Sequence, residues 1–276
     1  MTLGEVLSAT ADYLARKGVE TPRLDAELIV AHALQLSRLE LYTQHDRPLT
    51  EAERAAARPL VERRGRREPL AYVLGEWGFR RLILRTDARA LVPRPETEIV
   101  VERALALIAG IESPRVVDVG TGSGAIALAI VDEHPGAIVT ASDLSPEALA
   151  LARENAERLG LKIETVETNL LDGLAGPFDL VVSNPPYVSA GELPGLQPEV
   201  RDWEPLLALV GDEQTAELVR AARGVLVGGG SIVLECHEAR AAEVAALLDE
   251  SGYAEATITP DLAGRERVVE ARWEPR

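Results

Sequence analysis

The sequence predicts a doubly wound α/β domain that follows a small helical domain, with a β-hairpin joining the two. Three observations predict this architecture. Apolar positions in the first 73 residues recur at helical spacing, glycines and a short apolar run follow, and from residue 93 short β-branched runs alternate with helical segments. We therefore expect a helical domain over residues 1–73, a hairpin linker over 74–92 and an α/β domain over 93–276.

Two segments and their end signals predict the helical domain. Residues 22–36 place apolar side chains at helical spacing behind Pro22, a residue that is common in the first turn of a helix. Thr50 precedes two glutamates and is expected to cap a second helix that runs to Arg64.

Five arginines lie within or just after the last turns of this second predicted helix. They are Arg58, Arg63, Arg64, Arg66 and Arg67. The simpler interpretation is a solvated helix end whose long side chains reach into water. The alternative is a docking surface for an acidic protein partner.

The hairpin and the sheet follow in order. Gly75, Gly78 and the apolar run 82–84 predict the hairpin. The predicted parallel strands are 115–119, 137–142, 162–168, 179–183 and 231–236. The helices expected between them are 125–133, 146–159 and 213–227. A final antiparallel pair, 256–260 and 267–273, brings the expected sheet to seven strands.

The composition limits the classes of protein to which the chain can belong. Of its 276 residues 46% are hydrophobic and 4% aromatic, so it can bury a sizeable core of mainly aliphatic side chains. No apolar run approaches the length of a membrane span and the first residues lack a secretion pattern, so we expect a cytoplasmic protein. One cysteine, Cys236, and four scattered histidines leave no disulfide framework and no zinc cluster.

The negative charge lies entirely in the larger part of the chain. Residues 1–73 carry 11 acidic and 11 basic side chains, whereas residues 74–276 carry 34 acidic against 18 basic, which accounts for the net charge of −16. Such a surface repels a phosphate backbone, so the α/β domain is not expected to bind free nucleic acid by itself. The charge could also serve solubility alone.

A glycine loop follows the first predicted parallel strand. It reads Asp118-Val119-Gly120-Thr121-Gly122-Ser123-Gly124, and a helix begins directly after it. Alternate glycines allow a tight turn close to a ligand, and Asp143 ends the next strand, where its carboxylate can accept two ribose hydroxyls. Dinucleotide sites prefer a later third glycine, and Asp118 would repel a pyrophosphate but suit a cationic sulfonium. The loop therefore favours S-adenosylmethionine as the cofactor.

The fourth parallel strand ends in Asn184-Pro185-Pro186-Tyr187. Ligands of open α/β sheets bind beyond the carboxyl ends of the strands, so this turn is expected to face the cofactor. The prolines donate no N–H and leave rigid carbonyl acceptors, while Asn184 adds a side-chain carbonyl and Tyr187 an aromatic face. This set suits the planar NH₂ of an amide or of adenine. In isolation, the tetrapeptide could also be an ordinary strand-ending turn.

Such a nitrogen is a weak nucleophile because its lone pair is delocalised. Acceptors at the Asn184 side chain and the Pro185 carbonyl would hold both of its hydrogens and aim the lone pair at a methyl group. Preorganised acceptors and in-line alignment, rather than a strong base, would then provide the rate. We accordingly expect Asn184, Pro185 and Tyr187 to be the catalytic residues.

With these motifs the sequence resembles the HemK/PrmC-type protein-(glutamine-N5) methyltransferases that modify peptide chain release factors. The resemblance covers nearly the whole chain and includes both motifs above and the segments 22–27, 68–72 and 75–79. Its most specific blocks are Leu91-Val92-Pro93-Arg94-Pro95-Glu96-Thr97-Glu98 and Val200-Arg201-Asp202-Trp203-Glu204-Pro205 followed by Leu209.

The resemblance implies a seven-stranded Rossmann-like class I methyltransferase domain and a helical domain that recognises the substrate. It implies S-adenosyl-L-methionine as cofactor and, as methyl acceptor, the glutamine of the Gly-Gly-Gln motif in class I release factors. The methylation would support translation termination.

The resemblance also implies roles for single residues. The cofactor would lie against Asp118, Gly120, Thr121, Gly122, Ser123, Gly124, Asp143, Asn169, Leu170 and Asn184. The substrate would contact Phe79, Arg94, Glu98, Asn184, Pro185, Pro186 and Tyr187, although Phe79 suits a core position equally well.

Three further expectations concern residues around this site. An Arg94/Glu98 pair would order the entrance. The family often has Asp where this chain has Asn169, so either the Asn169 carbonyl or the nearby Asp172 would take the adenine amino group. Cys236 and His237 are expected to be packing residues.

Three other functions compete with this one. A nucleic-acid adenine methyltransferase would share the tetrapeptide but should carry a basic face or a target-recognition insertion. A glutamine methyltransferase acting on a ribosomal protein would differ in its helical domain. A non-catalytic module would need no paired carbonyl acceptors beside a methyl donor.

Overall fold

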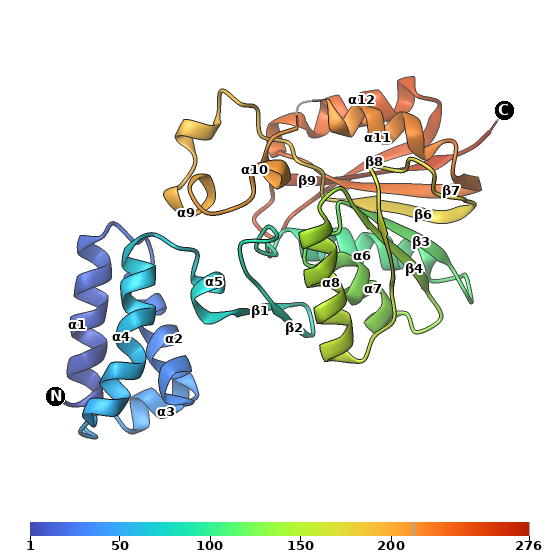
Figure 1. Ribbon diagram of the computed structural model, residues 1–276. Helices are drawn as coiled ribbons and strands as arrows, with labels where there is room; N and C mark the ends of the chain where they lie inside the picture. The colour runs from blue at the N-terminus through green and yellow to red at the C-terminus, as the bar shows by residue number, and fades with distance from the viewer. Residues whose placement is uncertain (212, 276) are drawn as a thin grey trace. The chain divides into compact units, whose positions relative to one another are not determined.

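The computed structural model describes residues 1–211 and 213–275 (Figure 1). The contacts between residues divide the chain into two compact units. The helical unit consists of Met1–Glu76 together with Gln197–Trp203, and the α/β unit of Trp77–Leu196 together with the chain from Glu204 onward. No pattern in the sequence predicts that the distant segment Gln197–Trp203 belongs to the helical unit.

Five helices form the N-terminal part of the helical unit. They are α1 (Leu3–Arg16), α2 (Pro22–Leu34), α3 (Arg38–Thr43), α4 (Glu51–Gly65) and α5 (Leu70–Leu74). Thr50 accepts a hydrogen bond from the backbone N–H of Glu53, and the Glu53 carboxylate accepts one from the backbone N–H of Thr50. This capping box confirms the predicted start of α4. Apolar clusters around Leu14 and Leu41 fill the space between the helices.

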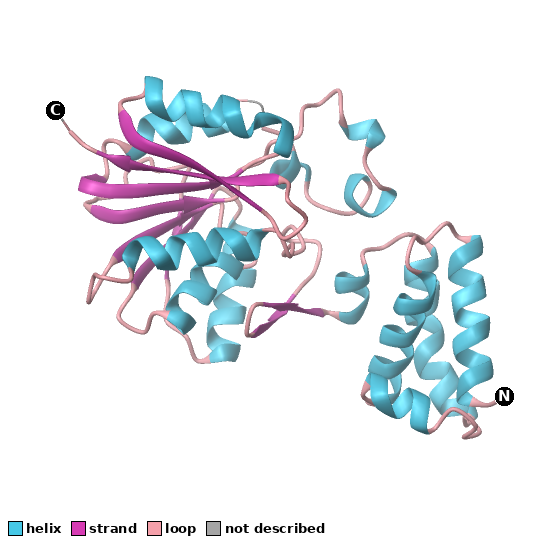
Figure 2. Ribbon diagram, turned by 180° about the vertical axis from the view of Figure 1, so that it is seen from behind, coloured by secondary structure: helices cyan, strands magenta, loops and turns pink. Residues whose placement is uncertain are grey.

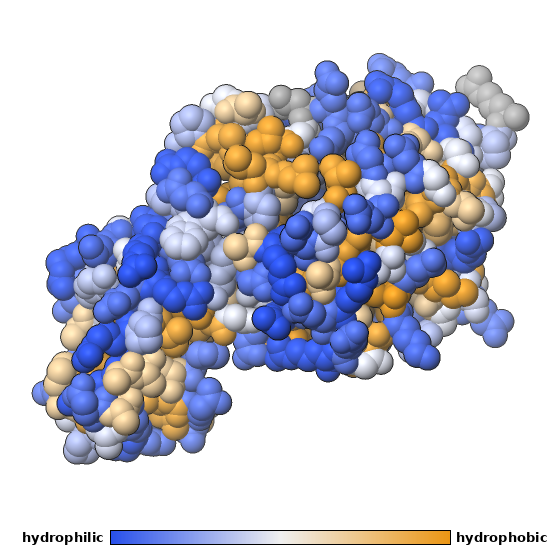
Figure 3. All heavy atoms as spheres, in the orientation of Figure 1, coloured by the Kyte–Doolittle hydropathy of each residue, from blue (hydrophilic) through white to orange (hydrophobic). Residues whose placement is uncertain are grey.

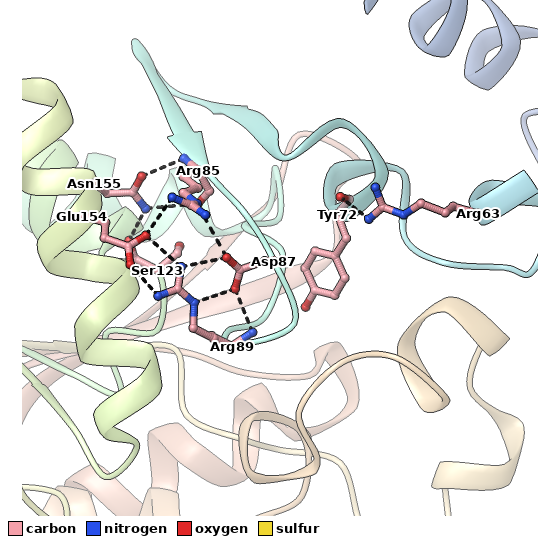
Figure 4. Close-up of polar contacts among 8 residues, drawn as sticks. All are labelled: Arg63, Tyr72, Arg85, Asp87, Arg89, Ser123, Glu154 and Asn155. Atoms are coloured by element: carbon pink, nitrogen blue, oxygen red, sulfur yellow. Dashed lines mark hydrogen bonds and ion pairs between the residues drawn. The ribbon is translucent and has the colours of Figure 1, made fainter. Parts of the chain in front are cut away.

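Three arginines at the end of α4 are used inside the helical unit. Arg63 donates to the backbone carbonyl of Tyr72 at 2.9 Å (Figure 4). Arg64 and Arg67 both donate to Glu199 of the short helix α9 (Pro198–Arg201), at 2.8 and 2.6 Å. Both expectations for the arginine cluster are therefore wrong for Arg64 and Arg67, whose side chains are 7% and 19% exposed and are held by Glu199. Arg63 is also held by acceptors of the helical unit, but 40% of its side chain is exposed to solvent.

The β-hairpin is confirmed. β1 (Glu76–Phe79) and β2 (Leu82–Arg85) form a two-stranded sheet. The turn between them is anchored to the α/β unit, because the backbone N–H of Arg80 donates to Glu98 at 2.9 Å and the Arg80 guanidinium pairs with Glu133.

The α/β unit is built on the predicted seven-stranded sheet, in the order β5-β4-β3-β6-β7-β9-β8. Its strands are β3 (Arg115–Val119), β4 (Ile138–Asp143), β5 (Glu164–Glu167), β6 (Phe178–Ser183), β7 (Leu226–Glu235), β8 (Tyr253–Pro260) and β9 (Glu266–Trp273). The first five are mutually parallel, and β9 runs antiparallel to both β7 and β8. The doubly wound sheet with its antiparallel tail is thus confirmed.

Helices cover both faces of this sheet (Figures 1 and 2). The longer ones are α6 (Thr97–Ile108), α7 (Ala125–Glu133), α8 (Pro146–Leu159), α11 (Gln214–Ala222) and α12 (Ala241–Glu250), and α10 (Leu206–Leu209) is a single turn. Helices α6, α7 and α8 lie on one face and α11 and α12 on the other (Figure 1). The prediction of α7 and α8 is confirmed to the residue, whereas α6 and α12 were not predicted.

The predicted end of α11 and the predicted start of β7 are wrong. The helix expected over 213–227 ends at Ala222, and the strand expected from Ser231 begins at Leu226. Three glycines at 228–230 argue against a strand, but they fall where the pairing of β6 with β7 shifts register. An irregular point of this kind tolerates residues without side chains.

The core of the α/β unit has two halves, one on each side of the sheet. Along β3 the side chains alternate, so that Val116 joins the cluster beneath α6 and α7 while Val117 joins the cluster beneath α11 and α12. Phe79 is 1% exposed and belongs to the first cluster. Within the described ranges, no helix has the length and apolar character that crossing a bilayer requires.

Candidate active site

A pocket lies in the α/β unit at the carboxyl ends of β3, β4 and β6. Its lining comes from residues 89–94 and 97, from the glycine loop and the start of α7, from 142–145 and 148, from 168–170, from 183–186, and from 205, 207, 208 and 214. The two motifs of the sequence analysis therefore meet in one pocket. This is the position at which open α/β sheets bind their ligands.

The glycine loop adopts a conformation that favours glycine at all three positions. Gly120, Gly122 and Gly124 have φ values of +71°, +57° and +84°. A Cβ atom on Gly124 would lie 3.1 Å from Leu128 and 3.2 Å from Ala152, so this glycine allows α7 and α8 to pack closely. A Cβ atom on Gly120 would meet nothing within 4 Å. Gly120 therefore offers bare backbone on the open side of the loop, where a ligand can approach.

Asp118 lies beneath the loop. Its side chain is fully buried, and Oδ2 accepts hydrogen bonds from the Thr121 hydroxyl at 2.6 Å and from the Ala127 N–H at 3.1 Å. Burial raises the pKa of the Asp118 carboxyl to about 7. Asp118 is not among the residues that line the pocket. Its position corrects the expected direct contact with the cofactor, because the carboxylate braces the loop from inside.

Asp143, the last residue of β4, lines the pocket as its position in the sequence suggests. Its Oδ2 atom accepts from the Gly122 N–H at 2.9 Å and its Oδ1 atom accepts from the Ser145 N–H at 2.9 Å. These bonds fix the carboxylate between the glycine loop and the start of α8. Each oxygen keeps a further lone pair, so the group can still accept hydroxyls of a ligand.

The segment after β5 forms another wall. Thr168, Asn169 and Leu170 line the pocket, and Leu170 has a φ of +50°, which is unusual for a residue with a side chain. Asp172, the alternative to Asn169, is exposed and does not line the pocket.

The Asn-Pro-Pro-Tyr turn supplies the opposite wall. Asn184, Pro185 and Pro186 line the pocket, and the preceding Ser183 hydroxyl donates to the Val119 carbonyl at 2.7 Å, which ties the ends of β6 and β3 together. Tyr187 does not line the pocket. Its ring lies 6.3 Å from that of His237, and burial raises the pKa of its phenol to about 12.

The expected pair of Arg94 and Glu98 is wrong. Arg94 lines the pocket, and its Nη2 atom donates to both carboxylate oxygens of Glu204, at 2.8 and 2.7 Å. Glu98 instead accepts from the backbone N–H of Arg80 and does not line the pocket. Sequence reasoning missed Glu204 because its partner lies 110 positions earlier in the chain.

Two anchoring side chains were also missed (Figure 4). Asn155 of α8 is fully buried and donates to the carbonyl oxygens of Ser123 and Arg85, at 2.9 and 3.1 Å. Arg89 lines the pocket and donates to Asp87 and to Glu154 of α8, all at 2.8 Å. Both residues hold the pocket wall against α8. A signal existed for Asn155, because it occupies the apolar stripe of an amphipathic helix.

Three remaining residues lie away from the pocket lining. Phe79 is a core residue, so a direct contact with a substrate is not supported. Cys236 is 3% exposed and packs in the core, which confirms the expectation for it. His237 is exposed, and its Nδ1 atom accepts from the Ala239 N–H at 3.2 Å, so it caps a turn instead of packing in the core.

The rim of the pocket is apolar on one side. Apolar side chains gather around α10 on the face shown in Figure 3. Leu206 and Leu207 of this turn are 58% and 47% exposed, and Leu207 also lines the pocket. The pocket therefore opens beside exposed apolar side chains.

Comparison with solved structures identifies the fold. The T. Thermophilus 16S rRNA N2 G1207 methyltransferase (RsmC), solved in complex with AdoMet and guanosine, matches with a TM-score of 0.55 at 18% identity. The match covers 71% of this chain and 49% of that one. The α/β unit, with its antiparallel β7-β9-β8 edge, has the class I methyltransferase fold.

Comparison with known sequences identifies the family. A profile described as PrmC N-terminal domain matches residues 5–75, and one described as Methyltransferase small domain matches residues 97–195. The release factor glutamine methyltransferase of Deinococcus radiodurans is 45% identical over 99% of both chains. That of Chlorobaculum tepidum is 43% identical over 93% of this chain and 92% of its own. The chain therefore belongs to the release factor glutamine methyltransferase family.

Proposed function

We propose that the protein transfers a methyl group from S-adenosyl-L-methionine to the side-chain amide nitrogen of the glutamine in the Gly-Gly-Gln motif of class I peptide chain release factors. The observation that carries the proposal is that Asn184 and Pro185 line the same pocket as Gly120 and Asp143. Acceptors for an NH₂ group and a site for a ribose thus lie in one cavity.

The residues present fit S-adenosyl-L-methionine. Asp143 would accept the ribose hydroxyls, Gly120 would lie against the ligand, and Asn169 and Leu170 would flank the adenine. When bound, the cofactor supplies an electrophilic methyl group on a cationic sulfonium. The acceptor atoms of Asp143 and Asn184 suit such a cation, and the two arginines of the pocket lining, Arg89 and Arg94, are both paired with carboxylates.

On the substrate side, Asn184 and Pro185 would accept the two hydrogens of the glutamine amide. The prolines fix the backbone torsion φ, so the acceptors need no rearrangement as positive charge develops on the nitrogen. The neighbouring Pro186 offers no N–H that could compete for them. Tyr187 would act indirectly, since it lies outside the pocket lining. No strong base is required, because a methylated amide nitrogen loses its proton readily.

The charge and the surface favour a protein substrate over nucleic acid. Beyond residue 73 the chain carries 34 acidic against 18 basic side chains, and this net charge of −16 would repel the phosphates of a duplex. The exposed leucines of α10 are better suited to a protein. We assign residues 1–73 to substrate recognition and 74–92 to the linker. Because release factors act on ribosomes, we place the enzyme in the cytoplasm.

The test is transfer of a labelled methyl group. The purified chain is incubated with methyl-labelled S-adenosylmethionine and, in separate reactions, with a class I release factor, ribosomal proteins or DNA. We expect label in the release factor alone, and none when its Gly-Gly-Gln glutamine is changed to alanine. Equal labelling of that variant, or labelling of ribosomal protein or DNA instead, would refute the assignment.

A further inference from the structure

Two neighbouring leucines at the rim of the pocket are exposed to solvent. Leu206 and Leu207 begin the single turn of α10. Leu207 lines the pocket, as does Ala208, whereas Leu209 of the same turn is buried. Leu209 therefore anchors α10 in the α/β unit. Apolar side chains at positions 206 and 207 add little to the packing of the unit and leave apolar surface beside the pocket.

Backbone hydrogen bonds hold α10 beside the Asn-Pro-Pro-Tyr turn. The Val188 N–H donates to the Leu209 carbonyl at 3.0 Å, and the Val188 carbonyl accepts from the Gly211 N–H at 3.3 Å. Val188 and Val210 accordingly form an isolated parallel bridge. Val188 is the residue that follows the Asn-Pro-Pro-Tyr turn. The exposed leucines are therefore fixed relative to the acceptor atoms of that turn.

Gly211 permits this close approach. A Cβ atom at this position would lie 3.0 Å from both the Cβ atom and the carbonyl oxygen of Pro186, and 3.1 Å from the Cδ atom of Gln214. The carbonyl oxygen belongs to the backbone of a rigid Pro-Pro pair, so it could not move aside. A larger residue at 211 would push the segment that carries α10 away from Pro186.

The proposed methyl acceptor is the side chain of a glutamine within a protein. Four bonds separate its Cα atom from its amide nitrogen, so the two atoms lie at most about 5 Å apart. When the nitrogen lies at Asn184 and Pro185, the polypeptide on either side of the glutamine must cross the rim of the pocket. α10 is the part of that rim which is hydrogen-bonded to the end of the Asn-Pro-Pro-Tyr turn.

The rim offers this polypeptide apolar contacts and few charged ones. Both arginines of the pocket lining, Arg89 and Arg94, are already paired with carboxylates of the chain. Apolar side chains gather around α10 in Figure 3. Single exposed leucines are common on protein surfaces, but adjacent ones at the mouth of a pocket are typical of a surface that a partner covers.

We propose that Leu206 and Leu207 form a docking surface for the stretch of the release factor that flanks the acceptor glutamine. The inference rests on the proposed function, because that function brings a polypeptide to this rim. The leucines hold the backbone of the substrate, while Asn184 and Pro185 hold the amide. Leu206 and Leu207 therefore determine the affinity for the release factor, and the acceptors of the turn determine the rate of transfer.

The first test measures affinity for the release factor by calorimetry, with S-adenosylhomocysteine bound. We expect Leu206→Ser and Leu207→Ser each to weaken binding about fivefold, and the double variant about tenfold or more, because part of each leucine is still available for burial. The KM for the release factor should rise in parallel. Since Leu206 does not line the pocket, Leu206→Ser should change the single-turnover rate at saturating release factor by less than about twofold.

Ile138→Ser is the matched control. Ile138 is 57% exposed, compared with 58% for Leu206, but it begins β4 at the opposite edge of the sheet from the pocket. Ile138→Ser should leave the affinity for the release factor unchanged. Equal affinities of Ile138→Ser and the double leucine variant would overturn the proposal. A double variant that binds S-adenosylmethionine more weakly but the release factor normally would also overturn it.

A cross-linking measurement that requires no methyl transfer identifies the occupant. Photoreactive p-benzoylphenylalanine is introduced at position 206 or, as the control, at position 138, and each protein is irradiated with the release factor. We expect an adduct from position 206 alone, and peptide mapping should place it on the residues next to the acceptor glutamine.

The outcomes separate this inference from the proposed function. An adduct with a distant part of the release factor, or between two copies of this chain, would overturn the docking surface. Methyl transfer to the glutamine without an adduct from position 206 would overturn it as well. An adduct beside the glutamine without methyl transfer to it would refute only the proposed function.

Discussion

Arg94 donates to both carboxylate oxygens of Glu204, at 2.8 and 2.7 Å, and the Glu204 side chain is fully buried. Arg94 belongs to the wall of the pocket. Glu204 is the residue at which the chain re-enters the α/β unit after Gln197–Trp203. One ion pair therefore fixes both the pocket wall and this re-entry point.

Arg94→Ala should destabilise the protein, because it leaves the Glu204 carboxyl buried without its cation. Burial already raises the pKa of Glu204 despite the nearby guanidinium. We expect the free energy of unfolding, measured with urea at about pH 8, to fall by about 3 kcal/mol. The double variant Arg94→Ala/Glu204→Gln should recover part of this loss, since a neutral amide costs less to bury. A double variant less stable than Arg94→Ala would contradict this account.

Asn184→Ala should impair the chemical step without impairing cofactor binding. The substitution removes one of two preorganised acceptors for the substrate NH₂. We expect the single-turnover rate to fall about 10²-fold or more, by analogy with the loss of one oxyanion-hole donor. The dissociation constant of S-adenosylmethionine should change little. Transfer at the wild-type rate would show that the acceptor argument is incorrect.

The sequence predicts those parts of the site that are formed by residues close together in the chain. The glycine loop, Asp143 and the Asn-Pro-Pro-Tyr turn each follow a recognisable strand, and the rule for parallel sheets places strand ends together. The pair of Arg94 with Glu204 could not be predicted in this way. It joins segments far apart in the chain, and no periodicity specifies which carboxylate a buried polar group meets.

The expectation that Asp118 contacts the cofactor could have been avoided from the sequence alone. It was expected to face the cofactor because it lies two residues before the first glycine. Strand alternation places Asp118 on the same face of β3 as Val116, toward α7. There it accepts from the Ala127 N–H in the first turn of that helix. Applying the two-residue period through to the end of the strand would have given this result.

Asn155→Ala should destabilise the α/β unit and loosen the glycine loop. The substitution leaves the Arg85 N–H and the Ser123 carbonyl, which Asn155 now satisfies at 2.7 and 2.9 Å, without those partners. We expect a loss of about 2 kcal/mol in the free energy of unfolding and weaker binding of S-adenosylmethionine in calorimetry. The control is Arg153→Ala on the exposed face of the same helix, which should change stability by less than about 0.5 kcal/mol. Equal effects of the two substitutions would argue against the anchoring role.

Glu199→Ala should release the segment Gln197–Trp203 from the helical unit. Glu199 accepts from Arg64 and Arg67, at 2.8 and 2.6 Å, and charge-assisted bonds of this kind are the stronger ones. Cleavage by trypsin after Arg201 should become about tenfold faster or more, because local opening exposes the segment. The control Glu20→Ala removes only an exposed contact to this segment and should change the rate less than about twofold. Similar cleavage rates in the two variants would contradict the prediction.

Stability should fall as the pH rises from about 5 to 8. Burial raises the pKa values of Asp118 and Glu235 from 3.8 and 4.5 to about 7. Between the unfolded and folded values the native state binds more protons than the unfolded state, so raising the pH favours unfolding. The groups around Glu235 are Thr97, Glu96, Arg94, Arg267, Tyr187 and Cys236.

Urea unfolding curves at several pH values measure this dependence. We expect the free energy of unfolding of the wild type to be highest near pH 5 within this window and to decline toward pH 8. Glu235→Gln cannot ionise at this position, so its decline should be smaller and should reflect mainly Asp118. A wild-type curve that rises with pH, or an equal decline in Glu235→Gln, would show that Glu235 does not titrate in this range.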